Sequence, residues 1–478
     1  MSIKTGETNL KWDARVIAAK QCGTVEQVLL ACADRAGLAV LESRCGHETY
    51  GRYSFVTFDP VTTLRCDDRN GVDPFDALDD AVLRFGIESD EDALPFVGGW
   101  VGYLGYEAGR FLERLPQQTQ RDLDLPFACF GLYDTLVVFD HLHERWHVAG
   151  VELPAEFAPR RPKLAERLDH MESLITAAAD QPPPPVTIPP ATRSDVLQNR
   201  DEYVRAVRRI LKYIRAGDIY QANLTTRFGV PMSNNSIDLY RALRRHNPAD
   251  YMAYLGCGDH QVLCSSPELF LHVERDRVLT RPIKGTRARA GDATEDRAVM
   301  AELLASEKDL AELAMIVDLE RNDIGRVCDE VSVDWPPTVE TYTTVHHLVA
   351  DVRGRLGESN PQAEGWVPHA ESVIDILRAT FPGGSITGAP KIRAMEIIDE
   401  LETVARGPYC GSIGYIGFDG RMAMNIAIRT MIVKDGRAYV HAGSGIVADS
   451  DPESEYRETM AKAKGMLAAL GVSVFSTR

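Results

Sequence analysis

The sequence lacks the patterns that identify several large classes of protein. Its nine cysteines are an odd number, and no two of them have the two-residue spacing of a metal-binding or redox motif. No run approaches 18 apolar residues, and the N-terminus has no apolar signal core. These absences argue against a disulfide framework, a zinc site and a membrane-spanning helix. We therefore expect a cytoplasmic protein whose thiols are reduced.

Positive charge is also in short supply. The chain has 53 Lys and Arg residues against 70 Asp and Glu residues, which gives a formal net charge of −17. This balance argues against nucleic acid or an anionic membrane as a partner. An anionic substrate would need a local group of cations or a metal ion to bind.

The hydrophobic and turn patterns predict an α+β protein with antiparallel sheets, because the expected strands arrive as hairpins with helices between them. Segments 130–139 and 422–433 each read as one strand, and segments 201–215 and 298–319 as helices. Six prolines between positions 182 and 190 predict an extended linker. We divide the chain into an N-terminal region (1–180), a proline-rich linker (181–194) and a catalytic domain (195–478).

Lys284 stands in Pro282-Ile-Lys-Gly-Thr286, between a short apolar segment and a glycine turn. A lysine becomes a nucleophile when nearby cations and a dry pocket favour its neutral amine. Arg287 and Arg289 follow closely and would attract an anionic substrate. A solvated cluster of basic side chains beside a turn is the alternative.

Three acidic residues are candidates for a Mg²⁺ site, since this ion prefers carboxylate oxygens. Glu455 and Glu458 are three residues apart on the last expected helix, so both project from one face. Glu312 begins a strongly apolar run in another helix. The alternative for Glu455 and Glu458 is an acidic first turn that the helix dipole stabilises.

Three further features have both a chemical and a structural interpretation. Glu268, among apolar neighbours, is a candidate general acid with a raised pKa. The glycine-rich loop 381–391 suits a carboxylate, and is otherwise a surface loop. Arg429 could bind a carboxylate through two hydrogen bonds or form an ion pair at a strand edge, and His347 could be a packed core imidazole.

These segments occur in a fixed order that resembles one enzyme family. The matching motifs are Ser266-Pro-Glu268, Pro282-Ile-Lys-Gly-Thr286, Glu312-x-x-Met-Ile-Val-Asp318, Gly388-Ala-Pro-Lys391, Gly411-Ser-Ile-Gly-Tyr415, His441-Ala-Gly-Ser-Gly-Ile-Val447 and Asp451-Pro-x-x-Glu-x-x-Glu458. They resemble the chorismate-utilising enzymes, which include anthranilate, aminodeoxychorismate, isochorismate and salicylate synthases. The resemblance implies two antiparallel sheets packed as a sandwich, with helices outside and the active site in the cleft.

Two positions resemble the aminodeoxychorismate branch of the family. Gln221 occupies the place of a lysine base in the isochorismate enzymes, and a neutral amide cannot deprotonate water. Lys284 occupies a position that is alanine in anthranilate synthases. The resemblance therefore implies amination of chorismate to 4-amino-4-deoxychorismate through a covalent Lys284 adduct, with Glu268 as the acid and Mg²⁺ as the cofactor. The residues that it implies for Mg²⁺ are Glu312, Glu455 and Glu458, and those for substrate are Tyr409, Arg429, Gly445, Thr286, Ser385, Thr387, His347 and Lys462.

Ammonia is the expected second substrate. A glutaminase elbow of the form Gly-x-Cys-x-Gly is absent from the sequence, so the expected source of ammonia is a separate glutaminase subunit as partner, or free ammonium. Glu42 and Ser43 resemble a segment that binds tryptophan in relatives. Two alternatives stay open: an anthranilate synthase component I, which releases pyruvate, and a non-catalytic subunit that binds an effector.

Overall fold

The computed structural model describes residues 8–44, 51–88, 94–191, 195–196, 199–232, 234–342, 345–357 and 372–472. The last three residues of the predicted linker, 192–194, lie outside the described residues. Residues 182–190, which hold the six prolines, carry no helix or strand, as expected for an extended segment.

Two large sheets organise the chain, and their strand pairs are antiparallel. Each sheet takes strands from both sides of the proline-rich segment. The 12-stranded sheet runs β11 (Asp195–Val196), β12 (Gln221–Pro231), β26 (Arg437–Ile446), β25 (Thr430–Lys434), β14 (Gln261–Ser266), β13 (Tyr251–Gly256), β3 (Ala39–Glu42), β4 (Tyr53–Thr57), β9 (Thr135–Asp140), β10 (Arg145–Glu152) and β2 (Lys11–Ala18), with β22 (Gly388–Ala389) paired to β12.

A nine-stranded sheet packs against the first, and two small sheets complete the β structure. The nine strands run β18 (Cys328–Val333), β21 (Val352–Leu356), β16 (Arg277–Arg281), β15 (Leu269–Glu274), β24 (Met422–Ile426), β23 (Ser412–Gly417), β7 (Gly99–Leu104), β8 (Ala128–Tyr133) and β5 (Thr62–Cys66). The three-stranded sheet is β17 (Ile283–Ala288), β20 (Val345–Val349) and β19 (Thr338–Thr341), and β1 (Thr8–Asn9) pairs with β6 (Phe85–Gly86) in parallel.

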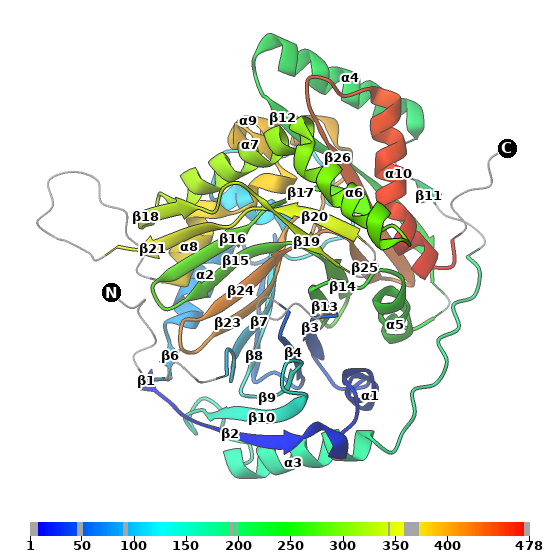
Figure 1. Ribbon diagram of the computed structural model, residues 1–478. Coiled ribbons are helices and arrows are strands. Elements are labelled where there is room, and N and C mark those ends of the chain that lie inside the picture. The colour runs from blue at the N-terminus through cyan, green and yellow to red at the C-terminus, as the bar shows by residue number, and fades with distance from the viewer. Residues whose placement is uncertain are drawn as a thin grey trace, which may run out of the picture.

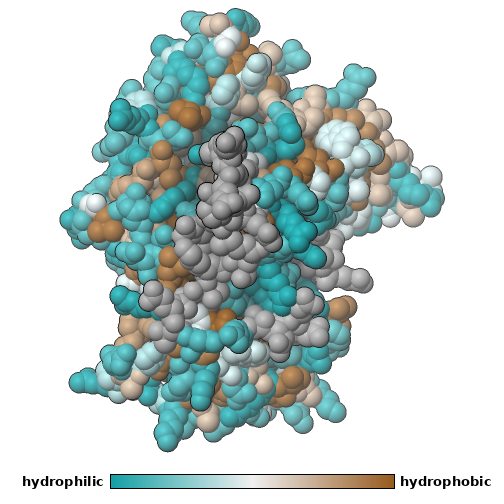
Figure 2. Space-filling view, turned by 90° about the vertical axis from the view of Figure 1, so that its left-hand side faces the viewer, coloured by the Kyte–Doolittle hydropathy of each residue, from teal (hydrophilic) through white to brown (hydrophobic). Residues whose placement is uncertain are grey.

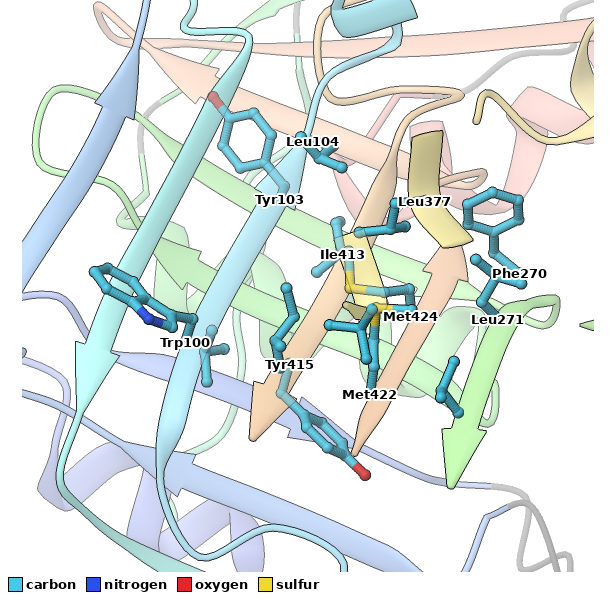
Figure 3. Close-up of a cluster of buried hydrophobic side chains, with 14 of the residues drawn as sticks. Trp100, Tyr103, Leu104, Phe270, Leu271, Leu377, Ile413, Tyr415, Met422 and Met424 are labelled. Carbon is cyan, nitrogen blue, oxygen red and sulfur yellow. The ribbon is translucent and has the colours of Figure 1, made fainter. Parts of the chain in front are cut away.

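Aromatic and aliphatic side chains hold the two large sheets together. Phe55 of β4 meets Tyr415 of β23 edge to face, with ring centroids 5.5 Å apart, and Phe96 contacts both rings. Figure 3 shows the part of this core around β7, β23 and β24, where Ile413, Met422 and Met424 lie side by side. Burial of this apolar surface is the main stabilising contribution to the sandwich. The predicted α+β class and the packing of two antiparallel sheets are confirmed.

Helices cover the sheets from outside. In Figure 1, α1 and α3 lie at the bottom near β2, β9 and β10, whereas α6, α7 and α10 lie at the top around β17 and β26. Their buried faces account for the helical periodicity of the sequence. The helices are α1 (Val25–Ala31), α2 (Pro74–Val82), α3 (Leu164–Ala178), α4 (Arg200–Ala216), α5 (Ser236–His246), α6 (Ala293–Ala305), α7 (Glu307–Ile324), α8 (Val373–Thr380), α9 (Lys391–Leu401) and α10 (Pro452–Ala469).

Local sequence signals set several helix ends. Asn199 caps α4 in a capping box with Glu202, and Gly217 ends that helix in the left-handed conformation. Asp451 caps α10, with Pro452 in its first turn. The helix predicted over 298–319 is instead two helices, because the Ser306 side chain caps the start of α7.

Two segments predicted as single strands each cross from one sheet to the other. Segment 130–139 contains β8 of the nine-stranded sheet and β9 of the 12-stranded sheet, which Asp134 separates. That buried carboxylate accepts hydrogen bonds from Arg161. Segment 422–433 divides into β24 and β25 in the same way. The single-strand predictions were wrong because both halves of each segment are apolar and β-prone, so composition does not mark the crossing.

Among the described residues, no helix is long and apolar enough to cross a membrane. The face of the molecule in Figure 2 is mainly hydrophilic, and its hydrophobic side chains occur in small groups.

Candidate active site

A cavity of about 560 Å³ brings together most of the predicted site residues. It opens at the edge of the two large sheets, where β14 passes to β15 and β24 passes to β25, and β17, α7 and α10 also contribute to its walls. The predicted residues that line it are Glu268, Lys284, Thr286, Glu312, His347, Ser385, Tyr409, Arg429, Gly445, Glu455, Glu458 and Lys462.

Lys284 reaches the cavity from β17. The pairing of β17 with β20 is irregular between Lys284 and Thr286, where Gly285 has a φ of +66°. Irregularities of this kind often re-aim side chains beside active sites. The Nζ atom of Lys284 lies 3.1 Å from Oε1 of Glu312, so the predicted nucleophile and a predicted metal ligand form an ion pair.

Glu268 and Arg429 occupy the two crossings between the sheets. The carboxyl of Glu268 is buried, and its Oε1 atom has no hydrogen-bond partner among the described residues. Burial raises the pKa of Glu268, although the Ser385 hydroxyl and the charge of Lys284 oppose the rise. Arg429, which we had placed inside a strand, lies between β24 and β25 with a φ of +50°. An acidic side chain and a cation therefore lie on the two connections between the sheets.

Three carboxylates lie on the helical walls of the cavity. Ser450 Oγ donates to Oε1 of Glu455 at 2.6 Å, whereas the buried Oε2 of Glu455 has no partner in the described chain. Glu458 pairs with Lys462 at 2.7 Å. No three ligating side chains are gathered into a ready metal site anywhere in the described ranges. The free Glu455 oxygen and the hard carboxylate donors nevertheless suit Mg²⁺.

His347 and Thr286 form a polar pair across β20 and β17. Nδ1 of His347 and Oγ1 of Thr286 are 2.9 Å apart. Burial, with a contribution from Arg429, lowers the pKa of His347 to about 4, so the ring is neutral near pH 7. A neutral imidazole beside a hydroxyl can orient a substrate hydroxyl or carboxylate but carries no charge of its own.

Thr387 is the predicted substrate residue that the structure does not bring to the cavity. Its side chain is fully buried, and Oγ1 donates to the carbonyl of Gly383 at 2.9 Å. This bond closes the glycine-rich loop and holds Ser385 at the cavity wall.

Sequence reasoning missed several residues that line the cavity. His441 belongs to one of the matched motifs, but we predicted no role for it. It stands on the same strand face as Gly443 and Gly445. This two-residue spacing was the signal in the sequence that pointed to His441. Lys308 and Asp309 come from the first turn of α7 and Asn223 comes from β12, and no local pattern marks them.

Glu42 and Ser43 lie elsewhere. A cavity of about 630 Å³ lies between the faces of the two large sheets, and Glu42 contributes to its lining. The carboxylate of Glu42 accepts two hydrogen bonds from Arg244, at 2.6 and 2.7 Å. Ser43 Oγ donates to Asp250 at 3.0 Å. Both residues therefore already have protein partners.

A buried acid, a lysine and several carboxylates around one cavity are typical of an enzyme active site. The family model for chorismate binding enzymes matches residues 39–468. This chain belongs to that family.

Relatives of two kinds are similar to the chain. It is 42% identical over 421 residues to anthranilate synthase component 1 of Thermus thermophilus, covering 88% of this chain and 87% of that protein. It is 39% identical over 442 residues to aminodeoxychorismate synthase component 1 of Salmonella typhimurium, covering 87% and 89%. The crystal structure of anthranilate synthase component I from Streptococcus pneumoniae matches with a TM-score of 0.74 and 36% identity, over 87% of this chain and 92% of that one.

Proposed function

We propose that this enzyme aminates chorismate with ammonia to give 4-amino-4-deoxychorismate and water, the reaction that leads to p-aminobenzoate and folate. The observation that carries the proposal is Lys284, an amine in the same cavity as the buried acid Glu268. Relatives named aminodeoxychorismate synthase component 1 support it.

Substrate binding would use both sides of the cavity. Tyr409, Arg429 and the backbone at Gly445 would hold the enolpyruvyl group, because a guanidinium and backbone N–H groups suit a carboxylate. A larger residue at Gly445 would displace the side chain of Gln221, since a Cβ there would lie 2.5 Å from Nε2 of Gln221. Thr286, His347, Ser385 and Lys462 would contact the remaining polar groups, and Thr387 would act by holding the loop.

Glu312, Glu455 and Glu458 would hold Mg²⁺. A bound Mg²⁺ supplies positive charge against the ring carboxylate of the substrate. Without it, the wall of the cavity would present three carboxylates to an anion, of which Glu312 and Glu458 lie beside Lys284 and Lys462. The cofactor therefore fits the net acidity of this wall.

The chemistry would take place in two displacements. Glu268 gives its proton to the C4 hydroxyl, which leaves as water, while the neutral amine of Lys284 attacks C2 and both ring double bonds shift. Ammonia then attacks C4, both double bonds shift back, and the C2–N bond to Lys284 breaks. Glu268 takes up the proton that the new amine releases. The raised pKa of Glu268 suits the first role, since the acid must be protonated when substrate arrives.

Ammonia would come from a separate glutaminase subunit or from free ammonium. The second cavity, beside Glu42, would take a free amino acid such as tryptophan. Glu42 and Ser43 would then act through the packing of β3, because their polar atoms are already engaged by Arg244 and Asp250.

A second candidate function is anthranilate synthesis, in which amination is followed by loss of pyruvate. The Thermus thermophilus relative at 42% identity favours it. Lys284 argues against it, because that reaction needs no lysine adduct at C2.

The Lys284→Ala variant tests the proposal. We expect aminodeoxychorismate formation to fall by at least about 100-fold, because the nucleophile is lost. Wild-type enzyme given chorismate without ammonia and then quenched should gain the mass of chorismate minus water on the peptide that contains Lys284. Lys308→Ala, which removes another lysine of the same cavity, is the matched control and should keep the adduct. An undiminished rate in Lys284→Ala would remove the covalent role.

A further inference from the structure

His441 is a cavity residue that the proposed reaction leaves without a role. It stands near the middle of β26, its side chain is only 1% exposed, and it lines the cavity. Neither ring nitrogen has a hydrogen-bond partner among the described residues. A buried polar group without a partner costs free energy, so such a group calls for a ligand or an ordered water.

Two other buried imidazoles show the contrast. His260 places its ring nitrogens 2.9 Å from the hydroxyl of Tyr103 and 2.8 Å from Asp259. The ring nitrogens of His346 lie 2.9 Å from Oγ1 of Thr341 and 2.8 Å from Oδ1 of Asp296. Both nitrogens of each of those rings have a partner within the protein, whereas neither nitrogen of His441 has one among the described residues, and the residue lines the cavity.

The ring of His441 is held in one plane and carries no charge. It stacks on Tyr409, with ring centroids 5.0 Å apart and an interplanar angle of 22°. Burial and then the charges of Arg227 and Arg406 lower the pKa of His441 well below its usual value. A neutral imidazole offers one N–H donor and one acceptor, so the site is a fixed hydrogen-bonding pair without a formal charge.

Two glycines follow His441 along β26. Gly443 and Gly445 occupy every second position after it, and all three residues line the cavity. A Cβ at Gly443 would meet the carbonyl oxygen of Leu224 and a Cβ at Gly445 would meet the amide of Gln221, so larger side chains do not fit beside His441. The stacked Tyr409 is the residue proposed above for the enolpyruvyl group, which places that group beside the ring of His441.

We propose that His441 is a substrate-binding residue that donates a hydrogen bond to the enolpyruvyl group of chorismate. The inference rests on the proposed function, because it needs chorismate in this cavity. This hydrogen bond adds an uncharged donor to Arg429 and the backbone at Gly445, which are proposed above to hold the same group. Tyr409 and His441 would then recognise the enolpyruvyl side chain of the substrate rather than its ring.

The test is equilibrium binding of chorismate with Mg²⁺ and without ammonia. His441→Phe keeps a ring that can stack on Tyr409 but removes both nitrogens, so we expect chorismate to bind about tenfold more weakly. His441→Gln restores an amide donor and acceptor and should recover most of the affinity. Benzoate, which carries a ring carboxylate but no enolpyruvyl group, should bind equally to wild type and His441→Phe.

His147→Phe is the matched control, since His147 is also a buried strand histidine of the 12-stranded sheet but does not line the cavity. It should bind chorismate as wild type does, and urea unfolding of each variant verifies that it is folded. Wild-type chorismate affinity in His441→Phe, or an equal loss for benzoate, would overturn the inference while leaving the proposed function standing. Failure of the wild-type enzyme to bind chorismate would overturn both.

Discussion

Glu320 makes the stability of this enzyme depend on pH, and the dependence can be isolated by one substitution. The residue lies in α7, its side chain is buried, and Oε2 accepts a hydrogen bond from Thr280 Oγ1 at 2.8 Å. Burial and then the neighbouring carboxyls of Glu268 and Asp323 raise the pKa of Glu320 from 4.5 to about 8, and the hydrogen bond from Thr280 and the charge of Lys391 offset only part of the rise. The folded protein therefore holds a proton there that the unfolded chain has released by pH 7.

The sign follows from the protons bound in each state. Between pH 4.5 and 8 the folded state binds more protons at Glu320 than the unfolded state, so the free energy of unfolding falls as pH rises. The contribution is fully present below pH 4.5 and is lost by the time pH has passed the folded pKa. Each pH unit in this window is worth about 1.4 kcal/mol, so the change from pH 5 to pH 8 amounts to roughly 3 kcal/mol.

Glu320→Gln removes the titration but keeps an oxygen that can accept from Thr280. We expect the variant to gain stability relative to wild type as pH rises, by roughly 3 kcal/mol between pH 5 and pH 8. Urea unfolding followed by tryptophan fluorescence at several pH values measures the difference. Glu330→Gln, at an exposed position of β18, is the control and should show no such gain. A constant difference between Glu320→Gln and wild type from pH 5 to pH 8 would refute the reasoning.

Three further predictions concern the active site and its support. Glu268→Gln should lower amination by about 100-fold or more while chorismate still binds, because the amide cannot protonate the leaving hydroxyl; unchanged turnover would exclude the acid role. Gly445→Ala should lower kcat/KM by at least about tenfold without unfolding the protein, since its Cβ would meet the Gln221 amide at 2.5 Å; wild-type kinetics would contradict this. Arg406→Met should cost about 3–5 kcal/mol in urea unfolding, because the buried carboxylate of Glu402 loses its partner at 2.7 Å; adding Glu402→Gln should recover part of that loss.

The sequence predicted most of the local structure, and most of the site residues that it predicted line one cavity. Capping residues such as Asn199 and Asp451 act within a few residues of themselves, so the helix ends that they set can be predicted without the fold. Ordered motifs identified the carboxylates and Lys284 as one set, and the structure places these side chains around one cavity.

The remainder depended on distant parts of the chain. The chain passes from one sheet to the other between residues 426 and 430, and Arg429 lies on this crossing. The residues before and after the crossing are equally apolar, so the hydropathy of the sequence does not reveal it. The pairing of Lys284 with Glu312 joins β17 to α7 and depends on how they pack. His441 was overlooked because its missing hydrogen-bond partners can be recognised only once its neighbours are placed.

Product analysis tests the central claim most directly. The purified chain would be given chorismate, Mg²⁺ and ammonium, and products would be separated by chromatography and identified by mass, with and without an added aminodeoxychorismate lyase. The account predicts an aminated chorismate that yields p-aminobenzoate only when the lyase is present. Direct formation of anthranilate and pyruvate would contradict it, and would mean that Lys284 does not direct the reaction.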